Sequence, residues 1–288
     1  MATEQSSAIG RRRLRLELRR ARDAAQLTQE QVSQEMDWSL SKLNRIESGA
    51  VSVSTNDLRA LLRLYRVDDP QRVKELTELA RASRHAPPWW AEYRDLITEP
   101  YRKFLEFEAA ASVIRHFNPL LIPGLYQTRE YARTIVERIS PTAVRSEHVE
   151  KYVEVRMMRQ HKVFSLARRQ VTVLIGEAAL RQRIGGRDVM RQQLESLLND
   201  ERPGGTLRVV PFTTDGHPGL AGGFGILEFA DPNDPDVLYL ESSPNVFVEH
   251  ENPIMVESYL SAFSQLEELA LSPSGTAALI RQVIAELS

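Results

Sequence analysis

The stretch TQEQVSQEMDWSLSKLNRIESG, residues 28–49, decides the fold of the N-terminal part of the chain. Thr28 is followed three residues later by Gln31, which is the pattern of a capping box. In such a box the threonine hydroxyl accepts an unpaired backbone N–H and the glutamine amide reaches back to the cap. The pattern predicts a helix that begins at Gln29.

A second helix, residues 39–48, follows after a short turn. Ser39 is its expected N-cap, and Asp37 tolerates the left-handed backbone of a tight turn better than most non-glycine residues. Two helices that cross steeply need a small residue at the crossing, which Ser33 provides, and apolar inward sides. The inward residues are expected to be Val32, Met36, Leu43 and Ile46.

The outward side of the second helix has the chemistry of base recognition. Arg45 can bond guanine bidentately, Asn44 can do the same for adenine, and Ser41 is adaptable. Leu40 can touch a thymine methyl group, whereas Lys42 more readily meets a phosphate. Gln29 and Ser39, at the starts of the two helices, are also expected to contact DNA, and Gln29 is expected to bind a backbone phosphate. The full set of expected DNA contacts is Gln29, Ser39, Leu40, Ser41, Lys42, Asn44 and Arg45. The alternative is an ordinary helical hairpin whose polar face is merely solvated.

The same residues resemble a known family. LTQEQVSQEM followed by LSKLNRIESG is similar to the repressor domain of the xenobiotic-response-element (XRE) type. In that family a glycine usually stands at Asp37 and a smaller aliphatic residue at Trp38. The resemblance implies DNA binding through the second helix. Because one such helix reads few bases, we expect a homodimer on a palindromic operator in double-stranded DNA.

Composition agrees with a DNA-binding module joined to a different domain. The 288 residues contain no Cys, which excludes disulfides, thiolate metal sites and a cysteine nucleophile. Residues 1–86 hold 16 basic and 12 acidic side chains, a balance of +4, and the remainder holds 21 and 27, a balance of −6. A solvated surface of mixed charge is the alternative explanation. No apolar run approaches the roughly 20 residues of a membrane span, and the first residues lack the apolar core of a secretory signal. We therefore expect a cytoplasmic protein that does not contact membranes.

The expected fold is mainly α with a smaller α/β part. A five-helix bundle of the XRE type, residues 10–86, follows nine N-terminal residues that we expect to be disordered. The paired prolines after His85 end this domain, and the second domain spans residues 89–288. Its first half, 89–168, is expected to be helical, including one helix from near Pro100 through Ile114. Its second half, 169–288, is expected to be α/β with a small mixed sheet. There the segments 171–175 and 207–211 read as parallel strands, and 224–229 with 237–240 as an antiparallel hairpin.

No arrangement typical of catalysis appears. The glycine-rich run GHPGLAGGFG, residues 216–225, does not fit a phosphate-binding fingerprint and leads into a strand, so a flexible loop is favoured over a nucleotide site. His217 in that run has no second histidine at helical spacing. We expect no catalytic residue, no metal site and no cofactor, although an enzyme with an unrecognised site that uses His217 stays open.

Aromatic side chains gather after residue 88. They indicate either a pocket for an effector or partner protein, or simply the core of the second domain. The candidate pocket residues are Trp89, Trp90, Tyr93, Phe107 and Tyr126.

Ordered motifs along the second domain carry a further resemblance, including WWAEYRDL, IPGLYQTREYAR, GEAALRQRIGG, GHPGLAGGFGILEF and AFSQLEELALSP. Together they resemble the WhiJ-like group of actinobacterial XRE regulators. The resemblance implies a transcriptional regulator, often encoded beside a small partner protein and likened to antitoxins. The second domain would then sense a small-molecule effector or bind that partner. The alternative is an antitoxin-like interaction protein whose DNA binding is autoregulatory.

Overall fold

The protein is described by a computed structural model that covers residues 2–47, 51–84, 88–139, 145–166, 169–232, 234–243, 246–250 and 252–287. The chain forms two compact units. The first consists of Met1–Arg94 together with Arg102–Ala110, and the second of Asp95–Tyr101 together with Ala111–Ser288.

The first unit is a helical bundle around one hydrophobic core. Its core side chains include Leu18 of the first helix, Val32 and Leu43 of the two motif helices, and Leu61 of the fourth. The helices are α1 (Ala2–Ala24), α2 (Gln29–Glu35), α3 (Leu40–Glu47), α4 (Thr55–Leu64) and α5 (Pro70–Arg84), followed by the 3-10 turn η1 (Trp89–Tyr93) and the larger part of α6 (Glu99–Ala110).

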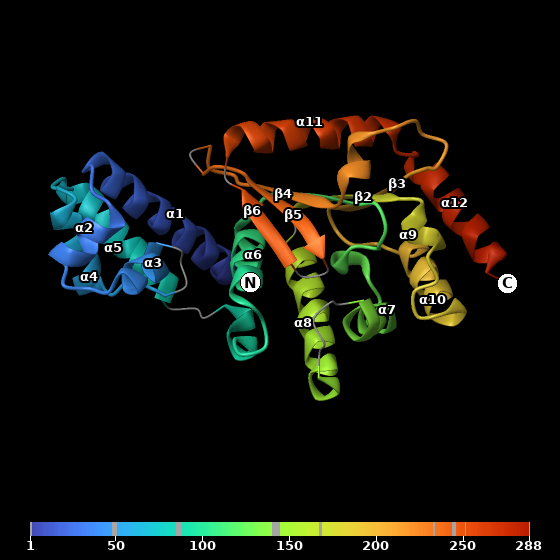
Figure 1. Ribbon diagram of the computed structural model, residues 1–288, viewed down its shortest axis with the longest axis horizontal. Coiled ribbons are helices and arrows are strands. Elements are labelled where there is room, and N and C mark those ends of the chain that lie inside the picture. The colour runs from blue at the N-terminus through green and yellow to red at the C-terminus, as the bar shows by residue number, and fades with distance from the viewer. Residues whose placement is uncertain are drawn as a thin grey trace. The chain divides into compact units, whose positions relative to one another are not determined.

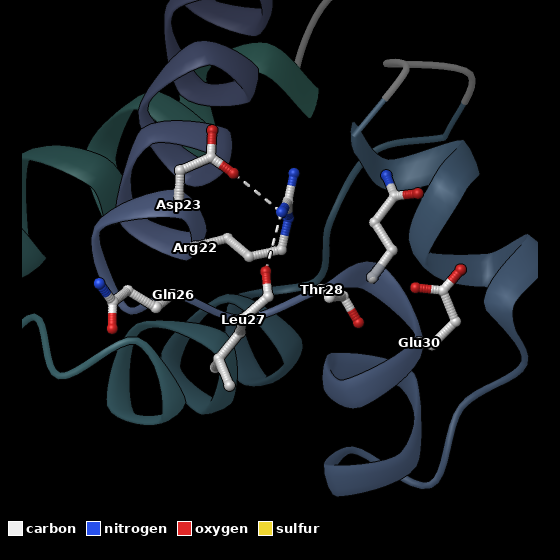
Figure 2. A pocket seen from close by; sticks show the side chains of 7 residues that line it. Arg22, Asp23, Gln26, Leu27, Thr28 and Glu30 are labelled. Carbon is white, nitrogen blue, oxygen red and sulfur yellow. Dashed lines mark hydrogen bonds and ion pairs between the residues drawn. The ribbon is translucent and has the colours of Figure 1, made fainter.

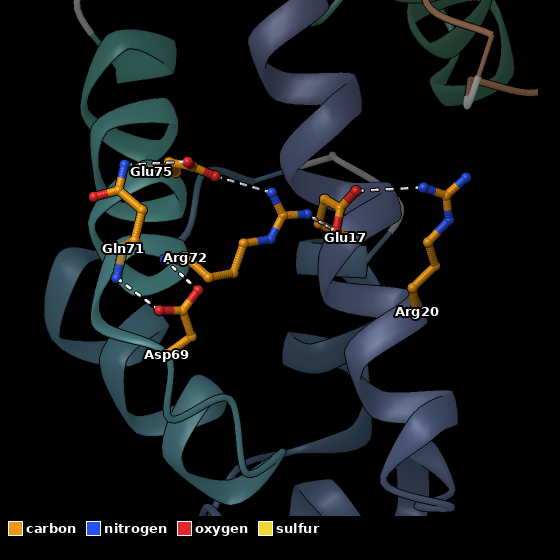
Figure 3. Close-up of polar contacts among 6 residues, drawn as sticks. All are labelled: Glu17, Arg20, Asp69, Gln71, Arg72 and Glu75. Atoms are coloured by element: carbon orange, nitrogen blue, oxygen red, sulfur yellow. Dashed lines mark hydrogen bonds and ion pairs between the residues drawn. The ribbon is translucent and has the colours of Figure 1, made fainter.

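A polar network ties α1 to α5, as Figure 3 shows. Arg72 of α5 donates hydrogen bonds to Glu17 of α1 and, at 3.1 Å, to Glu75. Asp69 accepts the backbone N–H groups of Gln71 at 3.1 Å and of Arg72 at 3.2 Å, and so satisfies the first turn of α5. Hydrogen bonding to Glu17 raises the pKa of the Arg72 guanidinium, so Arg72 remains a cation that joins the two helices.

The second unit is built on a six-stranded mixed sheet in the order β3-β2-β1-β4-β5-β6. β1 runs parallel to β2, β2 runs parallel to β3, and β4 pairs with β1 in the antiparallel sense. β5 and β6 continue antiparallel to their neighbours. The strands are β1 (Val113–Asn118), β2 (Gln170–Gly176), β3 (Gly205–Val210), β4 (Phe224–Glu228), β5 (Val237–Ser243) and β6 (Val246–His250).

Helices pack against this sheet (Figure 1). α11 runs along one face, where Phe263 and Leu266 join Phe117 and Phe224 of the strands in one core. The helical elements of this unit are η2 (Gly124–Tyr126), α7 (Arg129–Thr134), the π-helical turn η3 (Ile135–Ile139), α8 (Ser146–Phe164), α9 (Ala178–Arg181), α10 (Arg187–Leu198), η4 (Pro218–Ala221), α11 (Pro253–Leu269) and α12 (Pro273–Glu286). None of the helices in the described residues combines the length and apolar character needed to span a bilayer.

The expected fold class is confirmed, with a helical N-terminal bundle and a mixed sheet in an α+β C-terminal part. The strands expected at 171–175 and 207–211 are parallel neighbours, and those expected at 224–229 and 237–240 form an antiparallel pair. Residues 85–87 of the expected boundary lie outside the described residues.

Several local expectations are wrong. The helix expected to run from Pro100 through Ile114 ends at Ala110, and Ile114 lies in β1. β1 pairs with a strand on each side, so an extended backbone satisfies its hydrogen-bonding groups there. At the N-terminus residues 2–9, which were expected to be disordered, belong to α1, because this helix begins at Ala2. Within the half of the second domain that was expected to be helical, Trp89–Tyr93 forms a short 3-10 turn. Strand β6 was not expected.

Candidate nucleic-acid interface

The helix-turn-helix is fixed by its caps and its turn. Thr28 and Gln31 form the expected capping box, because the Thr28 Oγ1 accepts the Gln31 N–H at 3.2 Å and the Gln31 Oε1 accepts the Thr28 N–H at 2.8 Å. Asp37 has a φ of 53°, which is the left-handed conformation expected at the turn. The Trp38 N–H then bonds the Ser33 carbonyl at 2.8 Å. The turn therefore stops α2 and redirects the chain into α3.

The inward residues of both helices lie in the core of the first unit. Val32 and Leu43 are fully buried, Ile46 is nearly so, and Met36 packs against them. Ser33 is buried as expected of a small residue, and its hydroxyl donates to the Glu30 carbonyl at 2.8 Å. Burial of one side of α3 leaves its opposite side to solvent.

That opposite side presents most of the expected base-reading residues. Ser41, Asn44 and Arg45 are all exposed, and their spacing of three and four residues places them on one side of the helix. The Arg45 Nε donates a hydrogen bond to the Ser41 carbonyl at 3.2 Å. In the free protein the guanidinium therefore lies along the surface of α3. Ser39 and Leu40 are exposed at the start of the helix. The last residue of the expected recognition helix, Ser48, lies outside the described residues.

Lys42 differs from its neighbours because it already has partners within the chain. Its ammonium lies 3.7 Å from the centroid of the Trp38 ring and 3.4 Å from the Asp57 carboxylate of α4. Sequence reasoning placed Lys42 on a phosphate and assigned no role to Asp57, since nothing in the linear spacing of residues 42 and 57 connects them.

A buried carboxylate locks α3 to α1 and α2. Glu47, at the end of α3, is only 3% exposed. It accepts bonds from the Arg22 guanidinium of α1 at 2.8 and 3.3 Å and from the Gln29 amide of α2 at 2.7 Å. Burial lowers the pKa of Arg22, but the hydrogen bond and negative charge of Glu47 outweigh it, so the net pKa lies above its ordinary value. Sequence reasoning missed Glu47, whose only signal was an acidic residue at the end of an otherwise apolar inward side.

Gln29 therefore contacts Glu47 within the protein, in addition to the DNA phosphate that it is expected to contact. Its amide nitrogen is engaged by Glu47, and its side chain is partly buried. An amide group carries two N–H donors and an acceptor oxygen, so one contact does not use its full capacity. The expected phosphate contact of Gln29 stays a prediction.

An open cleft lies between the end of α1 and the start of α2 (Figure 2). It is lined by Arg22, Asp23, Gln26, Leu27, Thr28, Gln29 and Glu30. The Arg22 guanidinium is held by the Leu27 carbonyl at 2.9 Å and by Asp23 at 2.8 Å. Asp23 and Glu30 are both exposed in this lining, so the cleft does not have the charge of an anion site.

Three arginines of α1 make structural contacts to α6. Arg12 and Arg15 are buried, with their guanidinium carbons 4.6 and 4.7 Å from the centroid of the Phe107 ring of α6. Arg11 is paired with Glu106 of the same helix at 3.2 Å. These side chains attach α1 to α6 within the first unit.

The aromatic residues proposed as a pocket are divided between the two units. Trp89, Trp90, Tyr93 and Phe107 belong to the first, and Tyr126 belongs to the second. Phe107 and Tyr126 are fully buried, as core residues are. Tyr126 meets the Phe164 ring edge-on, with 5.7 Å between the ring centroids.

The glycine-rich run is part of the structured second unit. Residues 218–221 form η4, and the run then enters β4, as expected of a segment that leads into a strand. Gly219 packs so closely on Phe117 that an added Cβ would lie 2.4 Å from its ring. His217 meets the same ring edge-on. This packing accounts for the glycine at 219 without a nucleotide.

Comparison with known families identifies both parts of the chain. Residues 13–76 match a helix-turn-helix domain, and residues 101–282 match the domain of unknown function DUF5753. No curated protein and no solved structure matched the chain. The match at residues 13–76 includes α2, the turn and α3, and such a domain indicates DNA binding. Because the second match covers more than half of the 288 residues, the chain belongs to the DUF5753 family, with a helix-turn-helix domain ahead of its family domain.

Proposed function

We propose that the protein is a sequence-specific DNA-binding transcriptional regulator that inserts α3 into the major groove. The observation that carries the proposal is the exposed side of α3, where Ser41, Asn44 and Arg45 stand together. The buried lock of Glu47 with Arg22 supports it, since recognition needs a helix held in a fixed orientation.

Each exposed group has a proposed role. Arg45 bonds guanine, Asn44 bonds adenine, and Ser41 accepts or donates according to the base. Leu40 contacts a thymine methyl group. Ser39 and Gln29 lie at the starts of the two helices, where contacts to the phosphate backbone set the register of the protein.

We propose that the protein acts as a homodimer. A single recognition helix reads only a few base pairs, so two copies related by a two-fold axis would read a palindromic operator. Their recognition helices would then lie about 34 Å apart. The resemblance to XRE repressors supports repression as the mode of regulation. Both the DNA target and the resemblance suit a cytoplasmic location.

For the second unit we propose a regulatory role, either in sensing a small molecule or in binding a small partner protein. A partner is favoured by three exposed apolar side chains, Leu120, Phe212 and Leu220, which are 56%, 63% and 70% exposed. Leu120 and Phe212 follow the ends of β1 and β3, and Leu220 precedes the start of β4. These strand ends lie at the same end of the sheet. Contiguous apolar patches mark surfaces that bind other proteins, and we propose that these three side chains contribute to one such patch.

The partner proposal, including its antitoxin-like form, has a direct test. The full chain is co-expressed with the product of a small neighbouring gene, and co-purification is compared with that of a Phe212→Ser/Leu220→Ser variant. Co-purification of the partner with the wild type and its loss with the variant would support a partner site at this end of the sheet. Equal behaviour of the two chains would remove these side chains from the proposal.

The DNA-binding proposal is tested by selecting bound fragments from random genomic DNA at fixed, near-physiological salt. Salt is fixed because non-specific affinity varies steeply with it. We expect an inverted repeat to emerge with the wild type and to disappear with a Ser41→Ala/Arg45→Ala variant. Gln29→Ala should weaken binding to all sequences alike. Enrichment of the same repeat by the double variant would refute the assigned base contacts.

A further inference from the structure

Lys42 sits in a small electrostatic cluster at the start of the recognition helix. Its ammonium stacks 3.7 Å from the centroid of the Trp38 ring and lies 3.4 Å from the Oδ2 of Asp57. The Lys42 and Asp57 side chains are 36% and 32% exposed, so both charges are partly withdrawn from water and still reachable from it. Asp57 is the only acidic residue in the first turn of α4.

The backbone holds both members of this pair in place. The Lys42 N–H donates to the Ser39 Oγ at 3.2 Å, and the Asp57 N–H donates to the Ser54 Oγ at 3.0 Å. Each charged residue is therefore the third residue after a serine cap, in the first turn of its helix. Lys42 and Asp57 are thus brought together by two capped helix ends and not by flexible loops.

The position of Lys42 creates a need for a negative partner. A cation in the first turn of a helix faces the positive end of the helix dipole, which is unfavourable. The first turn of α3 contains no acidic residue that would compensate. Asp57 and the negative face of the Trp38 ring supply that compensation in the free protein.

We propose that Asp57 competes with DNA phosphate for Lys42. This inference rests on the proposed DNA-binding function and deepens it. In the free protein the ammonium is held by Trp38 and Asp57, and on DNA it exchanges Asp57 for a backbone phosphate. Asp57 thereby lowers the affinity for every DNA sequence alike. Sequence preference is still determined by the base contacts of Ser41, Asn44 and Arg45.

The size of the effect follows from the exposure of the pair. An ion pair at a partly exposed surface changes an equilibrium constant by about two- to fivefold. A dimer contains two such pairs, so Asp57→Asn should raise DNA affinity by about four- to 25-fold. Asp68→Asn is the matched control, because it removes the same charge from an exposed residue between α4 and α5. That control should change affinity less than twofold.

A double-mutant cycle identifies Lys42 as the group through which Asp57 acts. Affinities of the wild type, Asp57→Asn, Lys42→Met and the double variant are measured on operator and random duplexes over a range of salt. We expect Lys42→Met to reduce the salt dependence by about one unit of slope for each domain, and Asp57→Asn to give no gain in its presence. A gain that persists with Lys42→Met would overturn the proposal in favour of direct repulsion between Asp57 and DNA. An unchanged affinity of Asp57→Asn would overturn it as well.

A measurement on the free protein separates this inference from the proposed function. The ring current of Trp38 should shift the Lys42 Hε resonances upfield, and the shift should fall when DNA is added. If the wild type binds DNA and these resonances stay shifted on the complex, the exchange is refuted while DNA binding stands. If the resonances are shifted in the free protein and no duplex binds, the proposed function fails and the exchange with it.

Discussion

Replacing Glu47 with alanine should strongly destabilise the first unit. The carboxylate is 3% exposed and accepts two bonds from the Arg22 guanidinium and one from the Gln29 amide. Its removal leaves the largely buried Arg22 cation and the partly buried Gln29 amide without their main acceptor. Because these bonds join α3 to α1 and α2, the orientation of the recognition helix should loosen together with the fold.

The magnitude can be estimated from these contacts. Removing one partner of a buried ion pair costs about 3–5 kcal/mol. Arg22 keeps its bonds to the Leu27 carbonyl and to Asp23, so the lower end of that range applies. A loss of about 3 kcal/mol is a large share of the roughly 5–15 kcal/mol that stabilises a typical domain. Glu47→Gln keeps the shape and one acceptor oxygen, and should cost less than Glu47→Ala.

Tryptophan fluorescence during urea unfolding measures this unit selectively. All three tryptophans, Trp38, Trp89 and Trp90, belong to the first unit. With a slope of about 1.5 kcal/mol per molar urea, a loss of 3 kcal/mol lowers the midpoint by about 2 M.

Glu75→Ala is the matched control, because Glu75 pairs with Arg72 at a side-chain exposure of 44%. Such an exposed pair is worth at most about 1 kcal/mol. If Glu47→Ala moved the midpoint no further than Glu75→Ala, the buried carboxylate would not hold the helices as argued.

Three further predictions concern DNA recognition and the second unit. Arg45→Ala should cost about 1–3 kcal/mol of operator binding and relax base preference at one position, whereas equal losses on operator and random duplexes would make Arg45 a phosphate contact. Burial raises the pKa of Tyr131 to about 12, above its unfolded value of about 10, so its contribution to stability is complete below pH 10 and is lost as pH rises toward 12. Between these values the second unit should lose about 1.4 kcal/mol per pH unit through this group, and Tyr131→Phe should flatten that slope in thermal unfolding followed by circular dichroism. An added Cβ at Gly176 would lie 2.5 Å from a backbone oxygen, so Gly176→Ala should cost about 1–3 kcal/mol or more. Gly216→Ala meets nothing within 4 Å and should leave the melting temperature unchanged, and similar melting for the two variants would contradict the argument.

The sequence by itself determined the helix-turn-helix. Thr28 with Gln31 marked the start of α2, Asp37 adopted the left-handed turn, and Ser39 capped α3. These signals act over three or four residues, so they do not depend on the rest of the chain. The parallel pairing of β2 and β3 could also be predicted from the sequence, because each strand is a short, mainly apolar run and a helical crossover separates them.

Only the tertiary structure decided the position of β1 and the partners of the charged residues. The stripe of apolar residues in α6 extends by one more helical step to Ile114, so local spacing favours a longer helix. Pairing with β2 and β4 instead draws Ile114 into the middle of the sheet. Glu47 with Arg22 and Lys42 with Asp57 are 25 and 15 positions apart in the sequence. Charge pairs form wherever folded helices bring them within a few ångströms, and the spacing of residues along a chain does not specify that distance.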